Sequence, residues 1–144
     1  MKKTRIAIIQ SMYRLEVTEN LVKHCVQTLE KQGLLGKQIA VFRVPGALEI
    51  PLVAQRLAKT KKYEAIIAFG AVLKGKTYHF EQVSDECVRG CMDVSRAYNL
   101  PVIFEVLCVY DIKDAIERAT SEVDNRGVEG ALSALAMLAL LKKI

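Results

Sequence analysis

The chain has 144 residues, of which 51% are hydrophobic and 26% charged, and its formal net charge is +5. This length fits one domain, 1–144, and the composition excludes an intrinsically disordered chain. The basic residues are dispersed without interleaved aromatic residues, which argues against nucleic-acid binding. The apolar stretch 131–141 is about half of what a bilayer requires, and no signal-peptide pattern leads the chain. We therefore expect no membrane span and a cytoplasmic location.

The first half of the chain alternates apolar runs with helical patterns. Its predicted elements are a strand over 6–10, a helix from an N-cap at Thr18 to Gly33, a strand over 39–44 and a helix over 48–59. Pro51 fits the first turn of that last helix, where a missing N–H costs little.

The second half continues the same alternation. Its predicted elements are a strand over 65–69, a loop over 70–79, a helix to Tyr98, a strand over 102–107, a helix from an Asp111 cap to Ala119, and a helix over 128–141. Strands that alternate with helices of this length form parallel βαβ units with right-handed crossovers. The sequence thus predicts a three-layer α/β/α sandwich around a four-stranded parallel sheet. Ligands of such sheets bind beyond the carboxyl ends of the strands.

Four cysteines occur, and none forms a Cys-x-x-Cys pair. Cys87 and Cys91 share one helical face, but no set with zinc-finger spacing accompanies them. Together with Cys25 and Cys108 they are expected to be small core residues in a reducing compartment.

Two of the predicted strand ends carry candidate ligand-binding residues. Tyr13 follows the first strand, where an aromatic ring can stack on a planar ligand, although ordinary packing at the rim is the simpler explanation. Gly46 follows the second strand and lets the backbone turn tightly. Glu49 lies in the first turn of a helix, so it either interacts with the helix dipole or accepts hydrogen bonds from ligand hydroxyls.

The segment 70–80 is the most informative part of the chain. Gly70 and Gly75 bracket an expected loop that leads into a helix N-terminus, which suits an anion such as phosphate. Thr77 adds a hydroxyl donor. His79 follows at the mouth of the helix, where it serves either as a capping or packing group or as a proton carrier near neutral pH.

The same segment, 70–77, matches the Walker pattern Gly-x4-Gly-Lys-Thr between a strand and a helix. An NTPase is therefore a serious local alternative, with Asp111 available to hold magnesium. Against it, the apolar residues 71–73 would be plain fillers and the chain is short for an NTPase domain. Phe104, Arg118 and Arg126 lie near the fourth strand or after it, and arginine suits phosphate, but each is a weak signal alone.

The combination of motifs is more specific than its parts. The stretches VPGALEIP at 44–51, GAVLKGKTYHF at 70–80, PVIFEVL at 101–107, AIERA at 115–119 and NRGVEGALSALAM at 125–137 occur in the order and at the intervals of one family. Over nearly its whole length the chain resembles the lumazine synthases, whose sheet is flavodoxin-like. The resemblance outweighs the Walker pattern, which covers a single loop.

The resemblance implies a cofactor-free reaction in riboflavin biosynthesis. It condenses 5-amino-6-(D-ribitylamino)uracil with 3,4-dihydroxy-2-butanone 4-phosphate to give 6,7-dimethyl-8-ribityllumazine, phosphate and water. By resemblance, Tyr13 stacks on the pyrimidine, and Ala47, Leu48 and Glu49 hold the ribityl chain. Val72 and Leu73 meet the pyrimidine edge, with Ala71 as a further substrate-binding residue. Lys76 and Thr77 cradle phosphate, and His79 moves protons. Arg118 pairs with phosphate, and it lines the site with Phe104 and Arg126, all three from a neighbouring subunit.

Some positions depart from the family pattern. Glu105 stands where glycine is common, which brings bulk and negative charge close to the expected phosphate region. Thr120 also replaces a usual glycine, while Arg126 and Lys74 replace a lysine and an arginine and keep the charge. The resemblance implies a homopentamer and, in some members, a shell of twelve pentamers. The usual extra leading strand looks absent here.

Four other interpretations compete with this one. They are an archaeal-type riboflavin synthase, against which the GKTYHF stretch argues; the NTPase; a flavodoxin-like module that binds a flavin; and a shell scaffold whose site has decayed.

Overall fold

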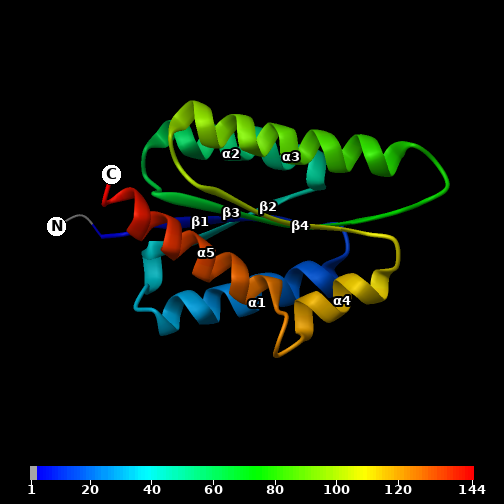
Figure 1. Ribbon diagram of the computed structural model, residues 1–144, viewed down its shortest axis with the longest axis horizontal. Helices are drawn as coiled ribbons and strands as arrows, with labels where there is room; N and C mark the ends of the chain where they lie inside the picture. The colour runs from blue at the N-terminus through cyan, green and yellow to red at the C-terminus, as the bar shows by residue number, and fades with distance from the viewer. Residues whose placement is uncertain (1–2) are drawn as a thin grey trace.

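The computed structural model describes residues 3–144, and Met1 and Lys2 lie outside the described residues. The elements in chain order are β1 (Ile6–Ser11), α1 (Leu15–Lys31), η1 (Gly36–Gln38), β2 (Ile39–Val44), η2 (Ala47–Glu49), α2 (Ile50–Thr60), β3 (Ala65–Leu73), α3 (His79–Tyr98), β4 (Val102–Val109), α4 (Ile112–Thr120) and α5 (Arg126–Leu141). The four strands are parallel, in the order β2-β1-β3-β4. Helices α2 and α3 cover one face of the sheet, and α1, α4 and α5 cover the other (Figure 1). The predicted three-layer, flavodoxin-like sandwich is confirmed.

The burial of the two central strands, β1 and β3, accounts for their continuous apolar sequences. Every residue of β1 is buried, as are all residues of β3 except Leu73. Strands of a parallel sheet that are covered on both faces carry such continuous apolar sequences. The outer strands β2 and β4 are less completely buried. They form the two edges of the sheet.

Each face of the sheet has its own hydrophobic core. On the α1, α4 and α5 side, Leu21 and Phe69 are fully buried. On the α2 and α3 side, Ile50 packs with Cys87 and Cys91. The predicted core role is confirmed for these two cysteines, and Cys25 is buried in the other core. It is wrong for the fourth cysteine, Cys108, which is exposed on the edge strand.

The predicted N-cap residues can be compared with the residues at which the helices begin. Thr18 is not an N-cap: α1 begins three residues earlier, after Arg14 adopts a left-handed conformation with φ 62°, and Thr18 is buried within the helix. Asp111 does cap α4, because its carboxylate accepts a hydrogen bond from the Lys113 N–H at 2.9 Å. Helix α5 starts two residues before the expected position because the Asn125 side chain accepts from the N–H groups of Gly127 and Val128.

Strand β3 extends further than predicted. The expected loop over 70–79 is shorter, because Gly70 to Leu73 continue the strand in register with Val106 to Val109 of β4. A Cβ on Gly70 would lie 3.3 Å from the Val106 side chain, so glycine provides room for the neighbouring strand. The connection between β3 and α3 is therefore only residues 74–78.

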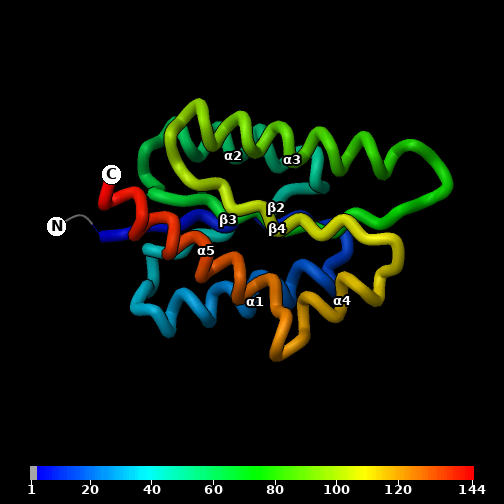
Figure 2. Tube along the Cα trace, viewed as in Figure 1, coloured from blue at the N-terminus to red at the C-terminus, as the bar shows by residue number. Residues whose placement is uncertain are grey.

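The tube view shows how the chain ends relate to this connection. The first described residues and the C-terminus lie at the edge of the sheet where the strands begin, and the β3–α3 connection projects from the opposite edge (Figure 2). None of the described helices is long and apolar enough to cross a bilayer. Within residues 3–144, no three His, Cys, Asp or Glu side chains converge as metal ligands.

Candidate active site

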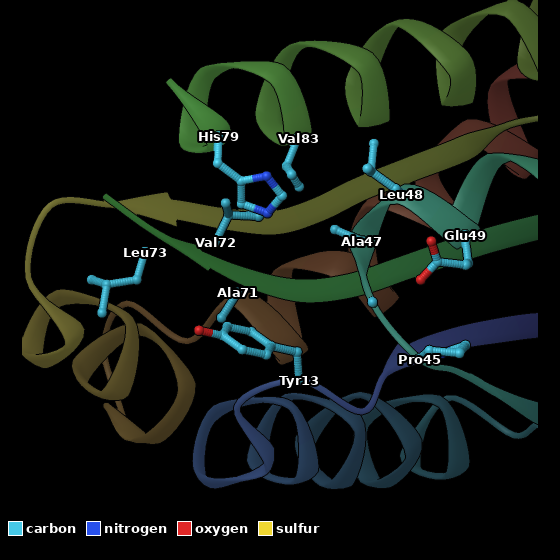
Figure 3. A pocket seen from close by; sticks show the side chains of 11 residues that line it. Tyr13, Pro45, Ala47, Leu48, Glu49, Ala71, Val72, Leu73, His79 and Val83 are labelled. Atoms are coloured by element: carbon cyan, nitrogen blue, oxygen red, sulfur yellow. The ribbon is translucent and has the colours of Figure 1, made fainter. Parts of the chain in front are cut away.

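A cavity of about 380 Å³ lies beyond the carboxyl ends of β1, β2 and β3 (Figure 3). It is lined by Tyr13, Pro45, Gly46, Ala47, Leu48, Glu49, Ala71, Val72, Leu73, His79 and Val83. These residues come from four separate segments of the chain, and eight of them were expected at the site. The cavity therefore forms where the parallel sheet predicted a ligand crevice.

The polar and aromatic groups of the cavity face it from different sides. In Figure 3, His79 reaches in from the α3 side, Tyr13 lies on the α1 side, and Glu49 is carried by the end of η2. Apolar side chains such as Val72 and Ala47 separate them. A mostly apolar cleft with a few convergent polar groups is typical of a small-molecule site.

Tyr13 is held at the cavity by the turn that follows β1. Its N–H donates to the Ser11 hydroxyl oxygen at 3.3 Å, and the Met12 N–H donates to the Val44 carbonyl at 2.8 Å, which ties this turn to the end of β2. The Arg14 guanidinium lies 5.4 Å from the centre of the Tyr13 ring. The tyrosine side chain is 52% exposed, so its ring remains accessible to a planar ligand.

The turn after β2 positions Glu49. Gly46 is extended, with φ −154°, so it is not needed for a tight turn as the sequence suggested. A Cβ there would lie 3.2 Å from the Glu49 carboxylate, a close contact with the end of an exposed side chain. The Glu49 N–H donates to the Gly46 carbonyl at 3.2 Å, which closes the turn. The Glu49 carboxylate is exposed at the cavity, where it can accept hydrogen bonds from ligand hydroxyls.

His79 is the first residue of α3, and its side chain is exposed at the cavity wall. The His79 N–H donates to the Thr77 hydroxyl oxygen at 3.4 Å. Val83 follows one helical turn later and lines the same cavity. The imidazole therefore has access to a ligand and to solvent, which proton transfer requires.

The connection before α3 is anchored at its base. The Lys74 N–H donates to the Val109 carbonyl at 2.9 Å, and its ammonium group pairs with the Glu81 carboxylate and lies 5.4 Å from the centre of the Phe80 ring. The hydrogen bond from Lys74 lowers the pKa of Glu81. The Phe80 ring in turn lies 5.8 Å from that of Tyr110. These contacts fix both ends of the short connection.

The structure excludes a Walker-type phosphate loop. In such a loop the residues between the glycines wrap around the phosphates with free N–H groups. Here Gly70 to Leu73 are extended and paired with β4. Of the segment 70–80, residues 74–78 alone lie outside a strand or helix. Lys76 and Thr77 are exposed in this connection and do not line the cavity of their own chain.

Three further expected residues also lie off the cavity, in β4 or in the helices after it. Phe104 is half-buried in β4 on the side of α2 and α3. Arg118 lies on α4, where its guanidinium donates to the Asp114 carbonyl at 2.9 Å. Arg126 begins α5 and pairs with acidic neighbours. Within one chain the structure therefore does not join these residues to His79 and Tyr13.

Three lining residues were not predicted as binding residues. Pro45 and Gly46 directly follow the end of β2, and this position alone was a usable signal. Val83 lies four residues after His79, so helical spacing places both on one face. An apolar side chain at such spacing is more often part of the core, which is why the sequence did not single it out.

Fold and cavity together define a flavodoxin-like α/β protein with a small-molecule crevice at the carboxyl edge of its sheet. The family model described as 6,7-dimethyl-8-ribityllumazine synthase matches residues 3–142. The chain therefore belongs to the 6,7-dimethyl-8-ribityllumazine synthase family. It is a transferase of riboflavin biosynthesis that condenses 5-amino-6-(D-ribitylamino)uracil with 3,4-dihydroxy-2-butanone 4-phosphate.

Proposed function

We propose that the cavity beyond β1, β2 and β3 is the active site of this condensation. The Tyr13 ring stacks on the pyrimidine, and the backbones of Ala71, Val72 and Leu73 meet its edge. Ala47, Leu48 and Glu49 hold the ribityl hydroxyls. The observation that carries this proposal is the convergence of these separate segments on one cavity of about 380 Å³.

His79 is the proposed proton carrier. When the pyrimidine amine attacks the ketone, a proton must leave the nitrogen and water must leave the carbon. Elimination of phosphate and ring closure then require further proton transfers. An exposed imidazole at the cavity wall can serve these steps in turn, because it can both accept and donate a proton.

The phosphate of the second substrate is the proposed ligand of Lys76, Thr77 and Arg118. Lys76 and Thr77 lie in the connection that directly precedes His79, so an anion held there lies beside the proton carrier. The guanidinium of Arg118 can bind two phosphate oxygens at once. In its own chain the Arg118 guanidinium donates to the Asp114 carbonyl and lies 4.0 Å from the Asp114 carboxylate, and its side chain is 36% exposed.

A neighbouring copy of the chain is proposed to complete each cavity. Phe104, Arg118 and Arg126 do not line the cavity of their own chain, and all three lie in β4, an outer strand, or in the helices that follow it. In a cyclic homopentamer this side of one copy would meet the cavity of the next, so a monomer would be inactive. A sixty-subunit shell is the larger assembly that we propose to test by light scattering.

A cytoplasmic location is proposed on the basis of the cysteines. Cys25, Cys87 and Cys91 are buried free thiols. Burial raises the pKa of Cys25, and the hydrogen bond with Cys91 followed by burial raises that of Cys87. Protonated core thiols of this kind suit a reducing compartment.

Substrate-specific kinetics test these assignments. Tyr13→Ala should raise the KM for the pyrimidine about tenfold or more, because it removes the stacking surface. Arg118→Ala should raise the KM for the sugar phosphate by a similar factor, because it removes a charged hydrogen-bond donor. Lumazine fluorescence measures both. If each variant affected the two substrates equally, the assignment of a ring side and a phosphate side would be wrong.

A further inference from the structure

An ion pair joins the two ends of the connection between β3 and α3. Lys74 is the first residue after β3, and its N–H donates to the Val109 carbonyl of β4 at 2.9 Å, so its backbone is fixed to the sheet. Its ammonium group donates to the carboxylate of Glu81, which lies in the first turn of α3. The two side chains are 35% and 34% exposed, so the pair is partly shielded from solvent. It links the sheet directly to α3.

The segment that this pair spans has little structure of its own. It consists of residues 75–78, whose backbone N–H groups donate to no backbone carbonyl of residues 3–144. The His79 N–H donates to the Thr77 hydroxyl oxygen at 3.4 Å, which is long for a hydrogen bond and holds the segment weakly. A segment with so few internal contacts depends on the groups that hold its two ends.

An aromatic contact also engages the lysine of this pair. The Lys74 ammonium lies 5.4 Å from the centre of the Phe80 ring, which is attractive for a cation, and the Phe80 ring lies 5.8 Å from that of Tyr110. Lys74 is thus bound by a carboxylate and a ring of its own chain. Lys76, in contrast, is exposed. The first lysine is suited to hold the connection, and the second is suited to meet a ligand.

We infer that Lys74 and Glu81 are positioning residues for the sugar phosphate. Their ion pair holds residues 75–78 in the shape that presents Thr77 and His79 to this substrate. The inference rests on the proposed function, which assigns phosphate to this connection and proton transfer to His79. Neither Lys74 nor Glu81 lines the cavity, so both act through the residues between them. Without the pair, the connection must be ordered each time phosphate binds, which weakens binding.

Glu81→Gln is the decisive variant, because two explanations predict opposite results for it. If the ion pair positions the connection, this variant should raise the KM for the sugar phosphate about fivefold, the size expected for the loss of a partly exposed ion pair. The KM for the pyrimidine should stay within about twofold. If Lys74 instead binds phosphate directly, the variant frees its ammonium group, and the KM for the sugar phosphate should fall. A fall, no change, or equal rises for both substrates would overturn the inference.

Exchange of the two charges provides the rescue. Lys74→Glu should raise the KM for the sugar phosphate, and combining it with Glu81→Lys should return this KM to within about twofold of the unaltered enzyme. No recovery in an assembled double variant would overturn the inference, and if the double variant assembled poorly, Glu81→Gln alone would decide. Arg89→Met is the matched control, because it removes an exposed ion pair with Glu86 on the same helix. It should leave both KM values within about twofold, and a rise equal to that in Glu81→Gln would count against a specific role of the pair.

A variant that combines Lys76→Ala with Thr77→Ala separates the inference from the proposed function. If this variant raises the KM for the sugar phosphate but Glu81→Gln does not, the inference is wrong and the proposed phosphate site stands. If it leaves this KM unchanged, the assignment of phosphate to the connection is wrong, and the inference falls with it.

Discussion

His79 is the chain's only histidine at the cavity, since His24, the second of the two, lies on α1 and bonds the Asn20 carbonyl. We expect His79→Ala to lower kcat by about 10²–10⁴-fold, the usual contribution of a general acid–base. Turnover should not vanish, because holding two substrates side by side supplies much of the rate. Lumazine formation under saturating substrates measures the loss.

His24→Gln is the matched control for that experiment. It replaces the half-buried imidazole on α1, which does not line the cavity, and should leave kcat within about twofold of the unaltered enzyme. Equal turnover in His79→Ala and His24→Gln would remove His79 from the mechanism.

Glu105 also makes a prediction about stability. Its ordinary pKa is 4.5, and burial raises the pKa in the folded protein to about 8. Between these values the unfolded chain has lost the proton while the folded chain keeps it, so folding becomes less favourable as pH rises. Relative to Glu105→Gln, the free energy of unfolding should fall by up to about 1.4 kcal/mol per pH unit between pH 5 and pH 8.

Denaturant unfolding at several pH values would show this difference. The unaltered protein and Glu105→Gln should be closest at pH 5 and furthest apart at pH 8, with the variant the more stable. Parallel curves would mean that Glu105 ionises normally in the folded state.

For single residues, the sequence indicated which positions were unusual but not which groups would surround them in the fold. Glu105 stood out as a departure from the family, but only its burial against α5 and the Glu129 carboxyl explain its raised pKa. The tight turn expected at Gly46 was wrong, because the residue is extended and lies close to the Glu49 carboxylate. Such causes depend on residues far away in the chain.

The helices pack so closely in one place that a single methyl group should disturb them. A Cβ on Gly127 of α5 would lie 2.3 Å from the Leu21 carbonyl oxygen of α1, which is part of the backbone. Gly127→Ala should therefore lower the free energy of unfolding by about 1–3 kcal/mol, because α1 and α5 must move apart. Urea unfolding followed by circular dichroism measures the change.

Gly75→Ala provides the comparison. Its Cβ would meet no heavy atom within 4 Å, and Gly75 does not adopt a positive φ. Its stability should stay within about 0.5 kcal/mol of the unaltered protein. If both variants lost the same stability, contact between α1 and α5 would not be the cause.

The order and type of the elements could be predicted, because each strand and helix has its own apolar pattern. The first and last residues of these strands and helices could not always be predicted. Strand β3 continues through Gly70 because β4 supplies hydrogen-bond partners, which no local pattern reveals. Helix α1 starts before Thr18 because Arg14 takes a left-handed conformation, an unusual choice for arginine.

For the molecule as a whole, the parallel sheet correctly predicted that a crevice would form where the strands end. It could not show which expected residues share a crevice within one chain. Tyr13, Glu49 and His79 do, whereas Arg118 and Arg126 lie on helices that follow the outer strand β4. This division of the residues is the reason for proposing a site that two copies of the chain share.

Co-assembly of two defective variants tests that shared site most directly. Mixed rings would be formed by refolding or coexpressing equal amounts of His79→Ala and Arg118→Ala chains. At about a quarter of the interfaces, the intact cavity of one variant would then face the intact arginine of the other. We predict that the mixture recovers about that fraction of the activity of the unaltered enzyme. Activity no higher than the mean of the two separate variants, in assemblies shown to be mixed, would contradict a shared active site.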